Sequence, residues 1–207
     1  MKTKEKLRFL TGFDAEEIGI DWGRAHVCTM EEPWKLFTSE VECRPAGLTF
    51  VEKVTQEALD PVDVGDTSDE IVGVGGGSSI DAAKYIGWLH GRPVTAIPTI
   101  ASVDAMVTPA IAVRVDGTVQ YIGNKAPERV LVINDLIERA PPRLNRAGIS
   151  DVLSCHTALC DWRLAFSVGR SAYSEAIASE AGEIRDRVVA AAEGIFRGSP
   201  EATRTLI

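Results

Sequence analysis

The chain has few cysteines, no long apolar run and no excess of basic residues. Its four cysteines, Cys28, Cys43, Cys155 and Cys160, show no CxxC pair and no framework spacing, so reduced thiols in a cytoplasmic protein are the simplest interpretation. No apolar stretch reaches the roughly 18 residues of a membrane helix, which argues against membrane insertion. The net charge of −8 argues against a nucleic-acid or anionic-membrane surface, since either needs a basic face.

The start of the chain, MKTKEKLRFLTGFDAEE, is basic but lacks the apolar core of a signal peptide. What remains is ordinary for a folded protein, because 45% of the 207 residues are hydrophobic and 25% are charged. This length accommodates one large domain or two small ones.

Short apolar runs separated by turn signals predict an α/β region up to about residue 142. We expect strands at 25–29, 71–74, 94–98 and 129–134, and helices at 47–59 and 81–89. Asp116-Gly117 between residues 111–115 and 118–122 predicts a hairpin, because this pair suits a two-residue turn. After Pro141-Pro142 only helical patterns follow, including an amphipathic helix at 178–196. We therefore predict an α/β domain at 1–142 and a partial all-helical domain at 143–207.

Three consecutive glycines stand between the predicted strand 71–74 and the helix near Asp81. A strand, a glycine loop and a helix in this order can bind phosphate, since the helix N-terminus presents unpaired N–H groups and glycines admit oxygen atoms close to the backbone. Ser78 or Ser79 can cap the helix, with Asp81 at a capping-box-like spacing from Ser78. The loop lacks the GxGxxG pattern, and a tight turn without a ligand remains the alternative.

Three segments occur together in order. They are VGVGGGSSIDAAK (72–84), PTIASVDAMVTP (98–109) and APPRLNRAGISDVLSCHTALCDWRLA (140–165). Over about residues 71–166 the chain resembles the glycerol dehydrogenase and glycerol-1-phosphate dehydrogenase group, in the superfamily of iron-type alcohol dehydrogenases and dehydroquinate synthases. The resemblance implies a dehydroquinate synthase-like fold, in which a parallel-sheet dinucleotide-binding domain precedes a helical domain.

The resemblance also implies an NAD(P)-dependent, metal-assisted dehydrogenase acting on glycerol, glycerol 1-phosphate or a similar polyol, with NAD or NADP as cofactor and a divalent metal, typically zinc. The glycine loop would hold the cofactor pyrophosphate, and hydroxyl side chains of the 98–109 segment would line the cofactor. The implied cofactor-binding residues are Gly76, Gly77, Ser78, Ser79, Thr99, Ser102 and Thr108.

Two aspartates match substrate and metal positions of the group. Asp104 falls on a substrate-binding aspartate, whose carboxylate can accept hydrogen bonds from two hydroxyls. The alternative is a loop aspartate that caps a turn. Asp151 matches the catalytic metal ligand, which also contacts substrate; its alternative is a helix N-terminal carboxylate that complements the dipole.

The pattern departs from the group in its histidines. Members complete the metal site with two histidines from later helices, but the histidines here are His26, His90 and His156. His156 and Cys155 are read as ordinary helix residues, and one carboxylate does not hold a catalytic zinc. The chain therefore resembles a member shortened within its helical domain, which predicts an exposed helical face and either self-association, as in a homo-oligomer, or poor solubility.

Two rival functions remain open. A dehydroquinate synthase-like lyase would need a basic cluster that is not evident, and a shortened dinucleotide-binding module would bind cofactor without turnover. Two further features are ambiguous: Glu31-Glu32 could bind an adenosine ribose or be solvated charge, and Lys125 could meet a substrate phosphate or lie on the surface.

Overall fold

The computed structural model describes residues 8–11 and 18–206. The basic segment considered above as a possible signal peptide therefore lies largely outside the described residues. The described chain forms two compact units, which divide between Ile137 and Glu138.

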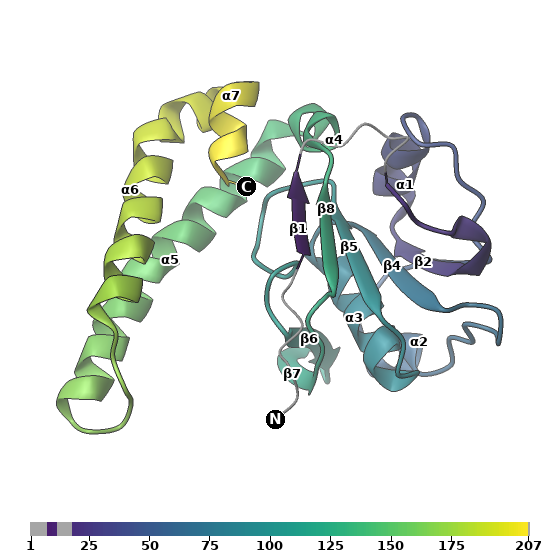
Figure 1. The fold of residues 1–207 in the computed structure, drawn as a ribbon, viewed down its shortest axis with the longest axis horizontal. Coiled ribbons are helices and arrows are strands. Elements are labelled where there is room, and N and C mark those ends of the chain that lie inside the picture. The colour runs from purple at the N-terminus through teal and green to yellow at the C-terminus, as the bar shows by residue number, and fades with distance from the viewer. Residues whose placement is uncertain (1–7, 12–17, 207) are drawn as a thin grey trace. The chain divides into compact units, whose positions relative to one another are not determined.

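The first unit is an α/β unit built around one parallel sheet (Figure 1). Its elements in chain order are β1 (Arg8–Thr11), a 3-10 helix (Trp22–Arg24), β2 (Ala25–Thr29), α1 (Glu31–Thr38), β3 (Gly47–Phe50), α2 (Gln56–Leu59), β4 (Glu70–Gly75), α3 (Gly77–Leu89), β5 (Val94–Pro98), β6 (Ala110–Val115), β7 (Thr118–Asn124), β8 (Arg129–Val132) and most of α4 (Asn134–Arg139).

The sheet has the strand order β1-β8-β5-β4-β2-β3, and all five of its pairings are parallel. Parallel strands need crossover connections, which α1, α2 and α3 supply between successive strands. The inner strands β2 and β5 are buried along their whole length. That is why both are mostly apolar and lack the strict polar–apolar alternation of a strand with one solvated face.

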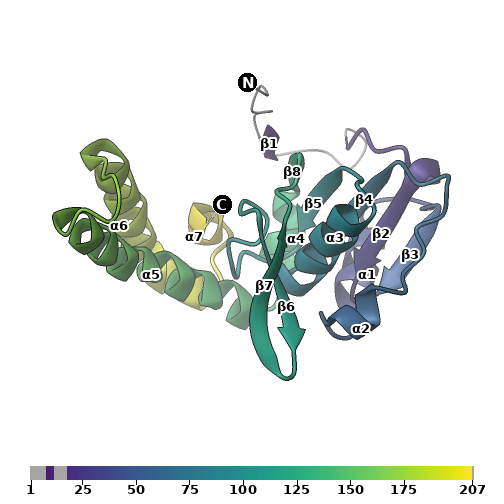
Figure 2. The same ribbon diagram turned by 90° about the horizontal axis from the view of Figure 1, so that it is seen from below.

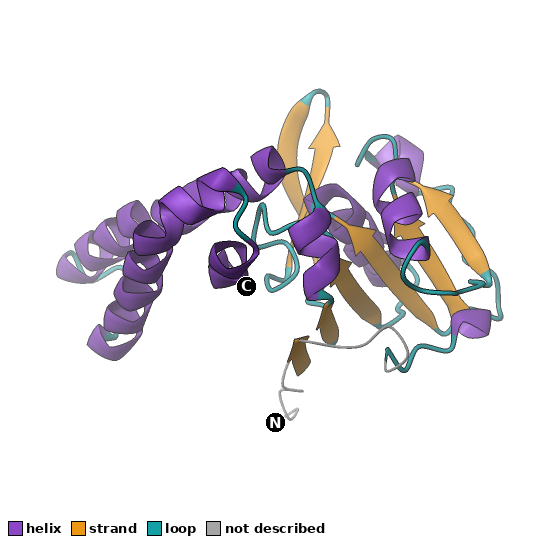
Figure 3. Ribbon diagram, turned by 90° about the horizontal axis from the view of Figure 1, so that it is seen from above, coloured by secondary structure: helices purple, strands orange, loops and turns teal. Residues whose placement is uncertain are grey.

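The two faces of the sheet pack against different helices (Figure 3). On β4, Ile71 belongs to the core shared with Ala83 and Ile86 of α3, whereas Val72 and Val74 belong to the core shared with Phe37 of α1 and Leu136 of α4. This alternation follows from the two-residue period of a strand. The glycine loop at the end of β4 thereby leads directly into α3.

The β6–β7 hairpin forms a separate two-stranded sheet (Figure 2). Asp116 and Gly117 at its tip have φ angles of 49° and 77°, the positive values that a primed two-residue turn requires. The predicted hairpin is confirmed. Its inner residues Ile111 and Val113 are fully buried in the core that α3 also lines.

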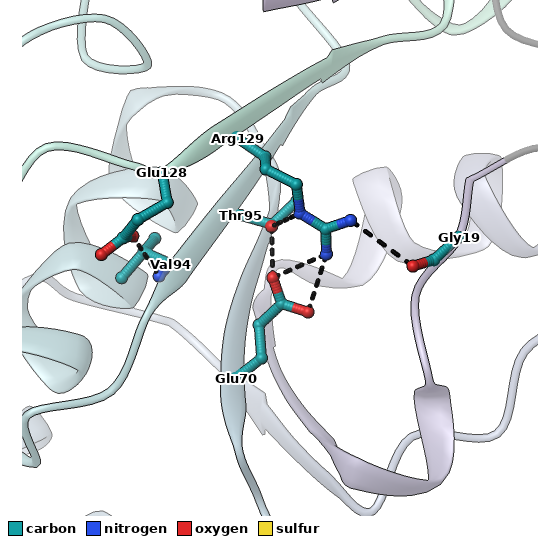
Figure 4. Close-up of polar contacts among 6 residues, drawn as sticks. All are labelled: Gly19, Glu70, Val94, Thr95, Glu128 and Arg129. Atoms are coloured by element: carbon teal, nitrogen blue, oxygen red, sulfur yellow. Dashed lines mark hydrogen bonds and ion pairs between the residues drawn. The ribbon is translucent and has the colours of Figure 1, made fainter. Parts of the chain in front are cut away.

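A polar cluster joins the amino ends of three strands (Figure 4). Arg129 at the start of β8 donates two hydrogen bonds to the carboxylate of Glu70, at 2.8 and 2.9 Å, and one to the hydroxyl of Thr95 on β5, at 3.0 Å. Thr95 also donates to Glu70. The cluster therefore links β4, β5 and β8 at the end of the sheet opposite the glycine loop.

The second unit is helical, with α5 (Pro142–Ser167), α6 (Glu175–Arg197), α7 (Pro200–Thr203) and a 3-10 helix (Arg204–Leu206). Pro142 begins α5, where proline costs no hydrogen bond, and Ser174 caps α6. Trp162 packs against Tyr173 with the rings tilted by 53° and 4.6 Å between ring centroids. No helix in the described residues combines the length and apolar character that crossing a membrane requires.

Most predicted elements are confirmed, but one helix prediction is wrong and some element bounds differ. Residues 47–59 form the edge strand β3 and the short helix α2, because Leu48 and Phe50 alternate with Gly47 and Thr49 along a strand. The helix predicted at 81–89 begins at Gly77, with Gly76 as N-cap. The helix predicted at 178–196 lies within α6, and the strand predicted at 129–134 ends at Val132.

Candidate dinucleotide-binding site

The glycine loop lies where the chain connections of the sheet change direction. From β2 the chain passes outward to β3, whereas from β4 it passes to β5 on the other side, so the carboxyl ends of the neighbouring strands β2 and β4 form a topological switch point. Ligands of open α/β sheets bind at such points. The Pro33 side chain of α1 comes within 3.5 Å of a Cβ built on Gly75, which places the first turn of α1 beside this loop.

Each glycine of the loop is closely approached by other atoms. Gly75 has a φ of 142°, and a Cβ built there would lie 2.5 Å from Ser79 Oγ. Such a φ strains any side-chain-bearing residue. A Cβ on Gly76 would lie 2.6 Å from Ile100 Cδ1, and one on Gly77 would lie 2.8 Å from Val103 Cγ2. The neighbours at Gly76 and Gly77 are ends of flexible side chains, so this cradle can also open toward a ligand.

The amino end of α3 is polar and uncapped. Gly76 is its N-cap, and no side chain within the described residues accepts a capping hydrogen bond there. Ser78 is exposed in the first turn, while Ser79 is fully buried and its Oγ has no hydrogen-bond partner in the described chain. The prediction that a serine caps this helix is therefore wrong. The unpaired N–H groups and the helix dipole leave a site suited to an anion.

The segment from Thr99 to Pro109 lies against this loop. The Thr99 N–H donates to the Gly75 carbonyl at 3.0 Å, and the side chains of Ile100 and Val103 cover Gly76 and Gly77 as described above. Ser102 and Thr108 are half-buried, and Asp104 is exposed beside Val103. The structure thus places Gly76, Gly77, Ser78, Ser79 and Thr99 at the carboxyl ends of β4 and β5, and Ser102, Asp104 and Thr108 on the segment that follows β5.

This region of the chain matches a known protein family. Residues 28–141 match the model of the family described as iron-containing alcohol dehydrogenase. The chain belongs to the iron-containing alcohol dehydrogenase family. The matched range includes β4, the glycine loop, α3 and the segment after β5, and the resemblance drawn from the sequence motifs is thereby confirmed.

Relatives of this family member include two archaeal proteins named glycerol-1-phosphate dehydrogenase [NAD(P)+]. The protein of Aeropyrum pernix is 36% identical over 166 residues, which cover 79% of this chain and 45% of the relative. The protein of Methanothrix thermoacetophila is 33% identical over 157 residues, which cover 76% of this chain and 43% of the relative. The chain therefore spans less than half the length of these two relatives.

Solved structures agree on the fold. A probable glycerol dehydrogenase from Sinorhizobium meliloti 1021 has a TM-score of 0.78 at 22% identity, with 96% of this chain and 61% of that chain covered. A glycerol dehydrogenase from Schizosaccharomyces pombe has a TM-score of 0.69 at 24% identity, with 96% and 57% covered. At these identities the likeness establishes the fold, and the predicted α/β fold class of the family is confirmed.

The residues at the switch point fit a dinucleotide. The helix N-terminus carries unpaired donors, Ser79 has a buried hydroxyl without a partner in the described chain, and a Cβ on any of the three glycines would collide with neighbouring side chains. These are the features that accept a pyrophosphate. A bound nicotinamide nucleotide would supply hydride acceptance, which no side chain provides.

The predicted metal ligand Asp151 lies in the helical unit, and its surroundings decide whether a metal site is present. Asp151 is half-buried in α5 and is the tenth residue of that helix, well past its first turn, so the alternative of an N-terminal carboxylate is wrong. Within residues 8–11 and 18–206, no three His, Cys, Asp or Glu side chains gather closely enough to hold a metal ion. The donor set of the described chain therefore does not fit a catalytic metal.

Other ionisable side chains of the helical unit line a cavity away from Asp151. A cavity of about 390 Å³ in the helical unit is lined partly by His156, Cys160 and Arg185, and its lining residues in the described chain do not include Asp151. The ring of exposed His156 contacts Arg185 through Nδ1 at 3.0 Å. His156 thus contacts an arginine of α6, as expected for an ordinary helix residue.

The charged residues whose roles the sequence left open, Glu31-Glu32 and Lys125, form ion pairs in the structure. Glu31 and Glu32 occupy the exposed first turn of α1, and both pair with Lys35, at 2.8 and 3.0 Å. Lys125 pairs with Glu128 at 2.6 Å, and the other carboxylate oxygen of Glu128 accepts a hydrogen bond from the Val94 N–H at the amino end of β5 (Figure 4). Lys125 therefore contributes to the amino end of the sheet.

A buried ion pair was missed by sequence reasoning. Lys84 of α3 is fully buried, and its ammonium lies 2.8 Å from the carboxylate of Asp81. Burial raises the pKa of Asp81, while Lys84 and a hydrogen bond from the Ala112 backbone oppose that rise. The sequence signal that could have indicated the burial of Lys84 is the apolar character of α3, in which Ile80, Ala83 and Ile86 are the neighbouring residues.

Proposed function

We propose that this chain forms the NAD(P)-binding part of a metal-assisted dehydrogenase that acts on a small polyol or polyol phosphate. The observation that carries the proposal is the uncapped α3 N-terminus with its glycine cradle at the switch point. The names of the relatives, glycerol-1-phosphate dehydrogenase [NAD(P)+], support glycerol 1-phosphate as the polyol phosphate. NAD and NADP are both included in the proposal.

The proposed reaction transfers a hydride from a carbinol carbon to C4 of the nicotinamide, while the hydroxyl loses its proton. Gly76, Gly77, Ser78 and Ser79 would bind the pyrophosphate through backbone N–H groups and hydroxyls. Thr99, Ser102 and Thr108 would line the cofactor, because all three lie on the segment that packs beside the cradle.

Two aspartates would serve the substrate. Asp104 is exposed beside the glycine loop and can accept hydrogen bonds from substrate hydroxyls. Asp151 would supply one ligand to a divalent metal, with zinc as the metal the resemblance implies. Because the described donors do not complete such a site, we propose that the isolated chain binds cofactor without turnover.

Self-association is part of the proposal. The helical unit exposes several large apolar side chains, and exposed apolar surface of this kind favours association. They include Leu164, Phe166, Val168, Ile177 and Phe196, each at least half exposed. Sedimentation velocity over a range of concentrations would detect the expected homo-oligomer, and a monomer at all concentrations would contradict it.

The experiment that tests cofactor binding is an NADH titration of the purified chain, followed by energy transfer from its four tryptophans. Saturable binding is expected. Ser79→Ala should weaken binding about tenfold, since a hydrogen bond to a charged group contributes about 1.5 kcal/mol or more. Without cofactor the same change should be neutral or stabilising, because the buried hydroxyl has no partner to lose.

Ser68→Ala is the matched control. Ser68 also has a buried hydroxyl without a partner in the described chain, but it lies in the loop before β4, away from the cradle. Its substitution should leave the NADH dissociation constant unchanged. A folded wild-type chain without saturable NADH binding would refute the proposed function, and equal effects of both serine variants would refute the role of Ser79.

A further inference from the structure

Lys84 is an unusual residue for its position. It lies two turns along α3 from the glycine loop, and its side chain has no exposed surface. Burying an ammonium group is costly unless the charge is paired and its N–H groups are hydrogen-bonded. The ion pair with Asp81 provides the charge balance, but charge balance alone leaves the ammonium donors to be accounted for.

These donors reach the segment that follows β5. The Lys84 Nζ donates to the backbone carbonyls of Ala105 at 2.9 Å, Ala110 at 2.5 Å and Thr108 at 3.3 Å. The segment from Thr99 to Pro109 contains no strand or regular helix, so its carbonyls have no ladder partners and need others. One buried ammonium thus holds two points of this irregular segment, and the first residue of β6, against α3.

The segment that Lys84 contacts carries residues that the proposed function uses. Asp104 immediately precedes the first of the three carbonyl residues, and Thr108 is itself one of them. At the other end of the same segment, Ile100 and Val103 cover Gly76 and Gly77. The helix that offers its N-terminus to the pyrophosphate is therefore tied, through Lys84, to the segment that carries Asp104.

We propose that Lys84 is a positioning residue, which fixes the 99–110 segment on α3 so that Ser102, Asp104 and Thr108 face cofactor and substrate. This inference rests on the proposed function for its catalytic meaning. Lys84 contacts neither cofactor nor substrate in this role, and it acts through the three carbonyls that it holds. Removing its donors should release the segment while the glycine cradle stays formed.

Hydrogen exchange of the cofactor-free chain, followed by mass spectrometry, tests the tie. In Lys84→Met the amides of residues 101–110 should exchange about tenfold faster, while those of β4 and β5 keep their protection. Lys35→Met is the control lysine, because Lys35 is exposed on α1 and pairs only with neighbouring carboxylates. Unchanged exchange in 101–110, or a uniform rise across the α/β unit, would overturn the inference.

A second variant guards against loss of folding. In Asp81→Asn/Lys84→Met both charges are removed, so no buried charge is left unpaired. The 101–110 amides should still exchange about tenfold faster than in the wild type, because their carbonyls still lack the ammonium donors. Restored protection in the double variant would show that charge balance, and not the three hydrogen bonds, holds the segment, and would overturn the inference.

An NADH arm separates this inference from the proposed function. Lys84→Met should still bind NADH saturably because the glycine cradle is intact, but more weakly than the wild type because Ser102 and Thr108 are no longer held in place. NADH should no longer protect residues 101–110. If wild-type chain fails to bind NADH, the proposed function fails and with it the catalytic meaning of the tie. The cofactor-free exchange comparison then still decides whether Lys84 holds the segment.

Discussion

At the scale of single residues, the glycine loop has distinct reasons for its glycines. Gly75 needs a backbone conformation that side-chain-bearing residues rarely adopt, and its missing Cβ leaves room for Ser79. Gly76 and Gly77 have no such conformational need, but they admit the side chains of Ile100 and Val103. The tight-turn and ligand interpretations of this loop are therefore compatible, since one backbone shape serves both.

Gly75→Ala tests this distinction against a matched glycine. The change should cost about 1–3 kcal/mol of unfolding free energy from backbone strain, and crowding of Ser79 should weaken NADH binding at least about tenfold. Gly65→Ala also places a side chain at a positive φ, of 67°, but no atom lies within 4 Å of its Cβ. It should lose stability without losing affinity. Equal affinity in the two variants, by NADH titration, would contradict the cradle.

His26 links stability to pH. Burial lowers its pKa below the ordinary value of 6.5, the positive charge of nearby His90 adds to this, and Asp63 opposes it. The unfolded chain therefore binds this proton more readily than the folded chain, so the contribution to stability is fully present above pH 6.5 and falls as the pH drops below it.

The expected result is a fall in unfolding free energy below pH 6.5, with a slope of at most about 1.4 kcal/mol per pH unit from this group. His26→Gln, which keeps a polar partner for Thr49 across β2 and β3, should flatten the slope. His156→Gln on the exposed surface of α5 is the control. Urea unfolding at pH 7.5 and 5.5 measures this pH dependence of the unfolding free energy. An identical pH dependence in wild type and His26→Gln would exclude His26 as its source.

At the scale of elements, the strands and turns that could be predicted were those with a clear local sequence pattern. The buried strands β2, β4 and β5 were predictable because parallel strands covered on both faces are apolar throughout, and the Asp116-Gly117 turn signal located the hairpin. The strand β3 was missed because Leu48, Val51 and Val54 also match a helical period, and its pairing with β2 is not encoded locally. The burial of Lys84 was missed because a charged residue in a helix taken to be amphipathic is assigned to the solvent-exposed face.

The Glu70–Thr95–Arg129 cluster should act as a clamp on the amino ends of β4, β5 and β8. Arg129→Met leaves a partly buried carboxylate without its partner, which should cost about 1–3 kcal/mol of unfolding free energy. NADH affinity should stay unchanged, because the cluster lies at the opposite end of the sheet from the cradle.

Arg24→Met provides the matched comparison for the clamp. Arg24 also pairs with an acidic residue, Asp69, but both side chains are more than half exposed, so its loss should cost less than about 1 kcal/mol. Urea unfolding of the two variants measures the difference. A larger loss in Arg24→Met than in Arg129→Met would show that burial does not control the strength of these pairs.

At the scale of the whole molecule, the two units carry different parts of the proposed chemistry. All the proposed cofactor residues and Asp104 lie in the unit that ends at Ile137, whereas Asp151 lies in the helical unit. Cofactor binding should therefore not require the helical unit. Residues 1–140 retain α4, whose Leu136 is fully buried in the core of the α/β unit, and should fold alone.

The fragment 1–140 should bind NADH with a dissociation constant within about threefold of the full chain, because it retains the entire glycine cradle. The same fragment carrying Gly75→Ala should bind at least about tenfold more weakly, as in the full chain, which excludes non-specific binding by a partly folded fragment. Circular dichroism checks folding, and energy transfer measures affinity. A folded fragment that has lost NADH binding would place necessary cofactor contacts in the helical unit, and the division of roles between the two units would then be wrong.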